Sequence, residues 1–255
     1  MTPSWKSVIL AVSAFASGGA ATAQDPAPGF EMLEEIFVDP AKLEQFRENW
    51  IAVRDIAQAE GYPFSTQVMA SANRMWLVTP VSGFADIDRI RNERTVLREA
   101  GGAPYQTAIA QVYDATISTE TVILERAPDF AYQPENDPLT GAAPGYVVLS
   151  VYAVKAGERD AAIEAVKAIK AINEAAQAPY GYDVRLSDLG IKGFQIVLIT
   201  YGADPIDHAE RTAQAQAALA QNTEFQTAFR DFIALTEGYQ EVAFTPMPAL
   251  ALNGG

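Results

Sequence analysis

The first strand-like segment of the sequence carries two adjacent carboxylates, Glu34 and Glu35. Neighbouring strand residues point to opposite faces of a sheet, so one of the two carboxylates must face inward. Glu34 shares its face with apolar residues, and burial among such residues raises the pKa of a carboxyl group and makes it a candidate base. Glu34 is therefore the candidate catalytic residue. Two alternatives to a buried base remain: the carboxylate could lie at a strand end open to water, or this Glu could form an ion pair with Arg74 on a neighbouring strand.

A matching segment later in the chain presents two phenols and a hydroxyl on one strand face, from Tyr146, Ser150 and Tyr152. Trp76, on another expected strand, could line the same space. A carboxylate, a hydroxyl and aromatic groups among apolar residues are typical of a small-ligand cavity. The sequence thus predicts that these four residues and Glu34 bind a small, largely apolar molecule in a cavity between two sheets.

The chain has one histidine, His208, and no cysteine. A zinc site or a Ser-His-Asp array would need that one imidazole. Asp204 followed by Pro205 predicts a helix start, which places His208 in the first turns of a helix, where we expect it to be a solvated surface residue. No metal and no cofactor are expected. The sequence also lacks a Gly-rich phosphate loop, HExxH, GxSxG and an EF-hand loop, which argues against the common kinase, hydrolase and metalloprotease classes.

The sequence contains two copies of one module. The stretch "GFEMLEEIFVDPAKLEQF" from Gly29 matches "GYVVLSVYAVKAGERDAA" from Gly145 in its progression from strand to turn to helix, and "YQTAI" from Tyr105 matches "FQTAF" from Phe225. The apolar side chains of the two pentapeptides are expected to be core. We predict a first repeat at residues 24–126, a Pro-rich linker at 127–144 and a second repeat at 145–255.

Hydrophobic periodicity gives each repeat the order strand-helix-strand-strand-helix-strand, with one more helix before the last strand. The strands of the first repeat are expected at 30–38, 66–69, 74–79 and 121–125, and those of the second at 146–154, 183–186, 194–201 and 239–245. This is the order of the split β-α-β, or ferredoxin-like, unit.

With that order given twice, the chain resembles a tandem member of the dimeric α+β barrel superfamily. The resemblance implies an α+β fold in which two ferredoxin-like (βαββαβ) repeats pack as a pseudo-dimeric barrel. Relatives of that fold include cofactor-free monooxygenases, haem-degrading enzymes and chlorite dismutase-like haem proteins, and the fold does not choose among them. Haem-binding relatives use an axial histidine on a helix of the second half. His208 is the only position that matches, but no surrounding motif supports carrying the role over.

The first residues are typical of an export signal. Lys6 supplies a positive charge, an apolar run follows at 8–16, and Ala21-Thr22-Ala23 forms an A-x-A cleavage site, so residues 1–23 are predicted to be a secretory signal peptide. No other stretch is apolar for long enough to cross a bilayer, so we expect no membrane insertion after cleavage. The mature protein is expected to be soluble and periplasmic or secreted.

Composition agrees with a packed globular protein, because 49% of the residues are hydrophobic and 20% are charged. The formal net charge is −14, and loss of Lys6 with the signal makes it −15. Such an acidic chain repels phosphate backbones, so nucleic acid and anionic lipid are poor partners. Without cysteines, the exported protein has no disulfides and depends on burial for its stability.

Three functions remain open at this stage. The protein could bind a small molecule in its cavity, it could be a cofactor-independent oxygenase or isomerase with Glu34 as the base, or it could be a structural or interaction module whose barrel is filled by side chains. Association into a homo-oligomer stays open as well. The identity of the ligand and the pathway do not follow from the sequence.

Overall fold

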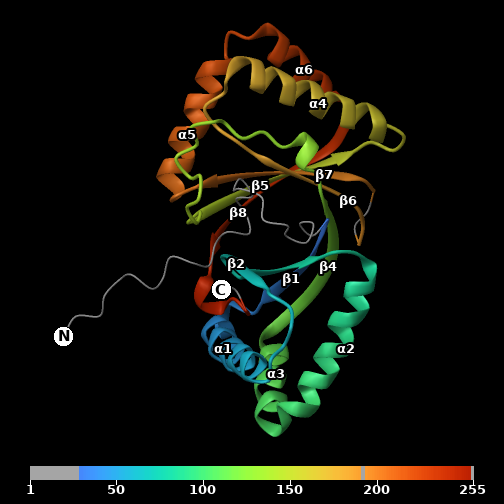
Figure 1. Ribbon diagram of the computed structural model, residues 1–255, viewed down its shortest axis with the longest axis vertical. Coiled ribbons are helices and arrows are strands. Elements are labelled where there is room, and N and C mark those ends of the chain that lie inside the picture. The colour runs from blue at the N-terminus through green and yellow to red at the C-terminus, as the bar shows by residue number, and fades with distance from the viewer. Residues whose placement is uncertain (1–28, 191–192, 254–255) are drawn as a thin grey trace, which may run out of the picture. The chain divides into compact units, whose positions relative to one another are not determined.

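The computed structural model describes residues 29–190 and 193–253. The predicted signal peptide lies outside the described residues. Within the described part of the chain there are eight strands and six α-helices, joined in the order shown in Figure 1. Among these helices, none combines the length and the apolar character needed to cross a membrane.

Both repeats have the predicted ferredoxin-like order, with the extra helix before the last strand. The elements of the first repeat are β1 (Phe30–Val38), α1 (Leu43–Ala59), β2 (Gln67–Ser71), β3 (Arg74–Val81), α2 (Phe84–Ala100), α3 (Gly102–Ala115) and β4 (Thr116–Arg126). The elements of the second are β5 (Tyr146–Val154), α4 (Arg159–Ala176), β6 (Asp183–Leu189), β7 (Gln195–Gly202), α5 (Pro205–Leu219), α6 (Thr223–Ala234) and β8 (Thr236–Pro246). The prediction of an α+β fold built from two such repeats is confirmed.

The hydrogen-bonded strand order is β1-β3-β2-β8-β5-β7-β6-β4, and it closes on itself as a barrel. The paired strands run antiparallel, with Glu34 opposite Leu77 in the pair of β1 and β3 and Ser150 opposite Leu198 in the pair of β5 and β7. The last strand of each repeat is longer than its apolar pattern predicts. In both, the first six positions are at least partly exposed, so they carry no apolar alternation.

Helix starts follow local capping. In α5, the Asp204 carboxylate accepts the backbone N–H groups of Ile206 and Asp207 at 2.8 and 2.9 Å, as expected of an N-cap. Asp39 also caps a turn, but that turn is the short 3₁₀ helix η2 (Pro40–Lys42), and α1 begins after it. A single 3₁₀ turn at a helix start is common, and the sequence pattern does not distinguish it from the first turn of an α-helix.

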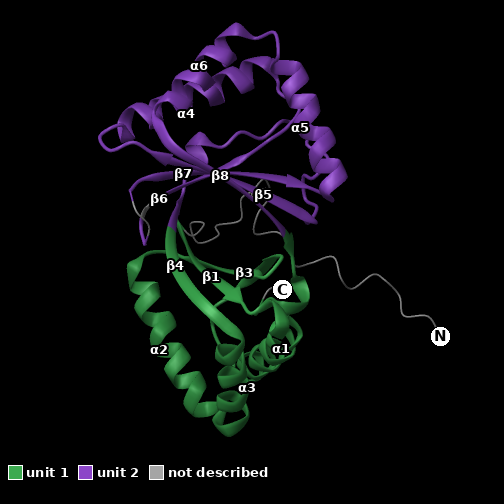
Figure 2. Cartoon of the chain, turned by 180° about the vertical axis from the view of Figure 1, so that it is seen from behind, with its two compact units in different colours: residues 1–123, 245–255 green, residues 124–244 purple. Residues whose placement is uncertain are grey.

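The chain divides into two compact units (Figure 2). The first contains the described residues through Ile123 and those from Thr245 onward, and the second is Leu124–Phe244. Each unit has its own core, formed where one face of its strands packs against its own helices. In the first unit this face of β1 carries Met32, Ile36 and Val38, and in the second unit β5 contributes Tyr152 and Val154.

The segment between the repeats packs on the second unit. Tyr132 forms an antiparallel bridge with Tyr182 and donates its hydroxyl to the carbonyl of Ala178 at 2.8 Å. Asp137 accepts a hydrogen bond of 2.6 Å from Arg211 on α5. Both side chains of this ion pair are at least nine-tenths buried, so the pair attaches the segment firmly to the helix.

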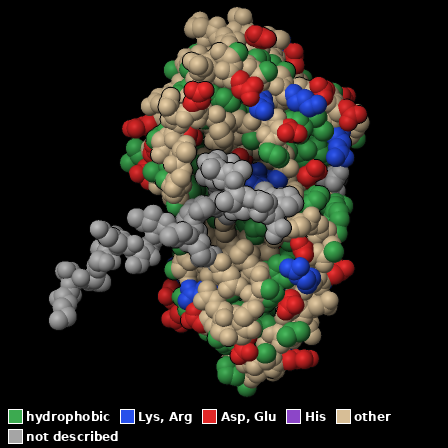
Figure 3. Space-filling view, in the orientation of Figure 1, with side chains coloured by type: hydrophobic (Ala, Val, Ile, Leu, Met, Phe, Trp, Pro, Cys, Tyr) green, Lys and Arg blue, Asp and Glu red, His purple; other side chains and the backbone are tan. Residues whose placement is uncertain are grey.

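Figure 3 shows acidic and basic side chains scattered over the visible face. The helix α2 carries intrahelical pairs such as Arg91 with Asp88 at 3.5 Å. Both side chains of that pair are about three-quarters exposed (74% and 77%). Exposed pairs of this kind contribute little to stability, typically about 0.3–0.5 kcal/mol.

Candidate functional site

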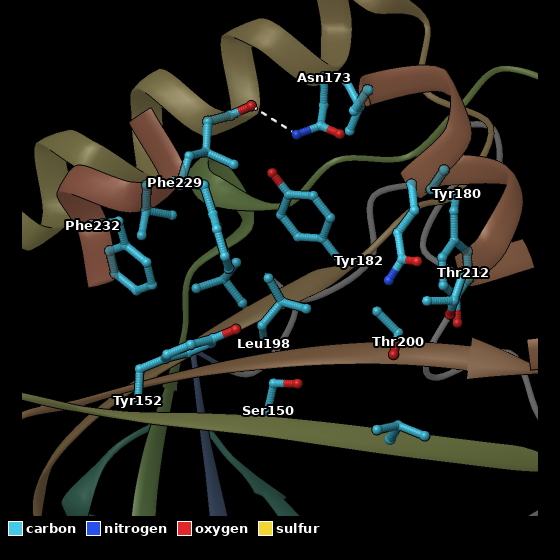
Figure 4. Close-up of a pocket in the computed structure, with 18 of the residues that line it drawn as sticks. Ser150, Tyr152, Asn173, Tyr180, Tyr182, Leu198, Thr200, Thr212, Phe229 and Phe232 are labelled. Carbon is cyan, nitrogen blue, oxygen red and sulfur yellow. Dashed lines mark hydrogen bonds between the residues drawn. The ribbon is translucent and has the colours of Figure 1, made fainter. Parts of the chain in front are cut away.

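A cavity of about 310 Å³ lies within the second unit. One side is formed by the strands β5, β6 and β7 and the other by the helices α4, α5 and α6 (Figure 4). A volume near 300 Å³ is at the lower end of the range of small-molecule sites. The cavity is therefore large enough for a small organic molecule and is lined by elements of one repeat.

The strand side of this cavity follows from side-chain alternation. On β5, Ser150 and Tyr152 face the helices, and on β7 Leu198 and Thr200 do the same. Every second residue of a strand shares a face, so these positions lie in two adjacent rows. The strand side thus offers the apolar surfaces of Leu198 and the Tyr152 ring, together with three hydroxyl groups, to a bound molecule.

The helix side is strongly aromatic. Phe225, Phe229 and Phe232 recur at i, i+4 and i+7 along α6, so all three point to one side of that helix and line the cavity. The Phe232 ring meets Tyr152 edge-on at a centroid distance of 5.0 Å, and Phe225 stacks on Phe229 at 6.0 Å. These contacts hold the rings in place and present a flat, apolar wall.

Tyr182 is the most unusual polar group of the cavity. Its side chain is 7% exposed, and its hydroxyl has no hydrogen-bond partner within the part of the chain that the structure describes. Figure 4 shows this hydroxyl directed toward α4, where Asn173 donates its amide to the carbonyl of Ile169 at 2.8 Å. Burial raises the pKa of Tyr182 well above its ordinary value, so the phenol stays protonated and can donate a hydrogen bond.

His208 also lines the cavity, in the first turns of α5. Its Nε2 atom is 2.9 Å from the Thr200 hydroxyl, and its ring packs edge-on against Tyr146 and Tyr180 at 5.5 and 5.6 Å. Gly202 makes this approach possible, because a Cβ atom there would lie 2.7 Å from the His208 Cβ. Burial lowers the pKa of His208, which favours the neutral imidazole near pH 7.

The surroundings of His208 do not fit an axial haem ligand. Nε2, one of the two nitrogens that could bind iron, is engaged with Thr200, and Tyr146 and Tyr180 pack closely against the ring. The cavity volume of about 310 Å³ is also small for a macrocycle. Over residues 29–190 and 193–253, no cluster of three or more acidic or histidine side chains is arranged to hold a metal ion.

The five residues predicted to share one cavity are not brought to one place. Ser150 and Tyr152 line the cavity of the second unit, whereas Glu34 lines a separate one of about 130 Å³ within the first unit. Tyr146 contacts His208 but does not line the cavity, and Trp76 lies on the opposite face of β3 from the Leu77 that does line the first unit's cavity.

Glu34 does face its helices, but its carboxylate is paired. Arg94 on α2 donates to both oxygens, one of them at 2.8 Å. The neighbouring Glu35 instead lies 3.4 Å from Arg74, so the pairing considered for Glu34 belongs to the adjacent residue. A bidentate guanidinium occupies both oxygens of the carboxylate and fixes its orientation.

Several residues of the cavity were not singled out by the sequence. Tyr182, Asn173 and the α6 phenylalanines had the pattern of ordinary core positions, and His208 was expected to be a solvated surface residue. The helix start after Asp204 was correct, but the first turn of α5 lies against β7, which half-buries His208. The glycine six residues before His208 was the available signal, since a helix that packs this closely on a strand requires one there.

Comparison with known proteins supports the fold. No protein-family model matches the chain, and neither does any curated protein. Among solved structures, an anthrone oxidase-like protein is 14% identical, with a TM-score of 0.56 over 89% of this chain and 94% of its own. A candidate monooxygenase from Lactobacillus acidophilus is 8% identical, with a TM-score of 0.53 over 89% of this chain and 96% of its own.

A chlorite dismutase variant from Candidatus Nitrospira defluvii has the same architecture, with 9% identity and a TM-score of 0.50 over 88% of this chain and 94% of its own. Identities this low are evidence of a shared fold and not of a shared activity. The chain shares with these structures a tandem ferredoxin-like α+β fold, as its sequence predicts.

Proposed function

We propose that the protein binds a small, largely apolar, uncharged molecule in the cavity of its second unit. The observation that carries this proposal is an aromatic cavity of about 310 Å³ lined by Tyr182, whose buried hydroxyl has no hydrogen-bond partner among the described residues. Ligand sites typically combine apolar walls with a few polar groups that fix orientation. Tyr182 and Ser150 would supply such groups, while the phenylalanines of α6 would contact an aromatic or alicyclic ring.

A fluorescent probe tests this proposal. N-phenyl-1-naphthylamine is uncharged and aromatic, and its emission rises in apolar surroundings, so we expect saturable enhancement with the wild-type protein. Ala215→Trp places an indole in the cavity from α5 and should abolish the signal. Ala217→Trp, at an exposed position of the same helix, is the matched control. Equal enhancement in both variants would place the probe elsewhere and refute the proposal.

A second candidate function is cofactor-independent oxidation or isomerisation of the bound molecule. It is favoured by the architecture shared with an anthrone oxidase-like protein and by the neutral His208 at the cavity. The paired Glu34 lies in the other unit, so the proposal assigns the role of base to His208. The imidazole would take a proton from an activated C–H or O–H group of the bound molecule.

Anthrone is a suitable probe of the second function. Its CH₂ group would become a carbonyl with one oxygen atom from O₂, while the other oxygen leaves as water. We expect O₂ uptake and anthraquinone formation above the uncatalysed rate, lost in His208→Phe and retained in Arg91→Ala, an exposed control. Binding of anthrone without O₂ uptake would remove the oxidase proposal and leave the binding proposal intact.

We also propose that the protein is exported and cleaved after Ala23. The charged start, the apolar run and the A-x-A site support this. The N-terminal sequence of the protein recovered from the periplasm or the medium should begin at Gln24. Recovery of the protein only from the cytoplasm with its first residues intact would refute the export proposal without affecting the binding proposal.

A further inference from the structure

The two cavities occupy equivalent positions in the two repeats. In the sheet, Glu34 is opposite Leu77 in the first repeat just as Ser150 is opposite Leu198 in the second. All four residues line their own unit's cavity. The pentapeptide helices agree as well. Tyr105, Ile109 and Val112 line the first cavity, and Phe225, Phe229 and Phe232 line the second.

The helices α2 and α5 can be aligned by a shared hydrogen bond. Asp86 accepts the backbone N–H of Ser82 at 2.8 Å, and Asp207 accepts that of Ala203 at 2.8 Å. Counting eight residues onward from each aspartate reaches Arg94 in the first repeat and Ala215 in the second. Both of these residues line their cavities, so they are structural equivalents.

The equivalent residues differ in size at the positions that decide the free volume. The first repeat has Glu34 and Arg94 where the second has Ser150 and Ala215. Trp50 in the first repeat stands at the position of Val166 in the second, since each lies on the matching face of the first helix. The first cavity measures about 130 Å³ against about 310 Å³ for the second. This difference arises although the second repeat has phenylalanine at the positions of Ile109 and Val112.

Arg94 is held across the first cavity. Burial lowers the pKa of the Arg94 guanidinium, but its hydrogen bonds with Glu34 and the negative charge of that carboxylate outweigh burial and raise the pKa. The bidentate geometry also fixes the direction of the long side chain. The ion pair therefore occupies the space that is open beside Ser150 and Ala215 in the second repeat.

We infer that the protein binds one apolar ligand per chain, in the second unit only, because the Arg94–Glu34 pair closes the equivalent site of the first unit. This inference rests on the proposed binding function and adds its stoichiometry and the residues that set it. The chain then consists of one ligand-binding repeat and one repeat whose cavity is narrowed by its own side chains. The same pair would have to be removed to recover the second site.

The test counts bound N-phenyl-1-naphthylamine at protein concentrations well above the dissociation constant, where the break in a fluorescence titration gives the number of sites. We expect one site in the wild type and two in Glu34→Ser/Arg94→Ala. Removing both partners avoids leaving a buried charge unpaired. Arg91→Ala removes an exposed arginine from the same helix and should leave the number at one.

A reciprocal variant keeps the inference testable if the first variant does not fold. Ser150→Glu/Ala215→Arg introduces the closing pair into the second unit and should reduce the number of sites to zero, with folding checked by circular dichroism. Two sites in the wild type would overturn the inference, as would a folded Glu34→Ser/Arg94→Ala protein with one site or a folded reciprocal variant that still binds. Absence of binding by the wild type would refute the binding function itself.

Discussion

Replacing Tyr182 with phenylalanine tests whether the Tyr182 hydroxyl binds a ligand or stabilises the fold. The Tyr182 hydroxyl is buried without a partner in the described structure, so the folded protein bears the cost of removing it from water. Phenylalanine keeps the ring, which lines the cavity, and deletes only the oxygen. The free energy of unfolding of Tyr182→Phe should therefore rise.

The magnitude follows from the desolvation of a hydroxyl. A buried polar group without a hydrogen bond costs about 1–3 kcal/mol, so this is the upper range of the expected gain. For a chain of this size each kcal/mol corresponds to about 2–4 °C in melting temperature. Such a stabilisation is rare for a substitution in a protein interior, since most of those destabilise.

Tyr180 provides the matched control. It lines the same cavity and is also 7% exposed, but its hydroxyl donates to the carbonyl of Tyr201 at 2.9 Å. Tyr180→Phe loses that hydrogen bond, so it should destabilise by about 0.5–1.5 kcal/mol. Urea unfolding of both variants, followed by circular dichroism, should give shifts of opposite sign.

Tyr182→Phe should stabilise the fold but weaken the binding of a ligand that accepts a hydrogen bond from the Tyr182 hydroxyl. Anthrone has a carbonyl acceptor, and loss of one hydrogen bond of about 0.5–1.5 kcal/mol weakens binding by about two- to tenfold. N-phenyl-1-naphthylamine has no oxygen acceptor and should bind Tyr182→Phe as it binds the wild type. If Tyr182→Phe destabilises the protein as much as Tyr180→Phe, the hydroxyl has a structural partner and the reasoning is refuted.

Two further predictions concern charges at the second unit. Because the pKa of His208 is lowered from 6.5, the unfolded chain binds more protons than the folded one below that pH, so the free energy of unfolding should fall as the pH drops from 7 toward 5. In His208→Asn, the free energy of unfolding should fall less over this pH range, which urea unfolding at several pH values would measure. If the wild type and His208→Asn show the same dependence of unfolding free energy on pH, His208 is not the group responsible. Asp137→Ala leaves the buried Arg211 without its counter-ion and should cost about 3–5 kcal/mol, whereas Asp129→Ala, also between the repeats but exposed, should cost little. Equal melting temperatures for these two variants would show that the ion pair contributes nothing.

The fold could be predicted from the sequence because its signals are local and occur twice. Strand alternation, the Asp204 N-cap and the matched pentapeptides at Tyr105 and Phe225 each predict an element from a few neighbouring residues. Agreement between two independent copies removes much of the ambiguity of each one. The least accurate predictions were the starts of β4 and β8, where exposed residues on both faces leave no alternation to detect.

The candidate site could be predicted only in part. Alternation correctly placed Ser150 and Tyr152 on one face with Glu34 at the equivalent position of the first repeat. It could not show that each repeat encloses its own cavity on the helix side, because two faces of a strand look alike until their partners are known. The burial of His208 depends on how closely α5 approaches β7, which is a tertiary property as well.

A cavity is harder to predict than a core, because its volume is a small difference between the space that the strands and helices surround and the volume of the side chains that fill it. The α6 phenylalanines have the helical spacing of ordinary core residues, and in isolation they predict a filled interior. The space beside them exists because Ser150 and Ala215 are short, and these residues come from a strand and a different helix. In the first repeat the long side chains of Glu34 and Arg94 stand at those two positions and leave less than half the volume. Size differences between equivalent positions of a duplicated sequence therefore indicate which copy can hold a ligand, although neither copy alone contains that signal.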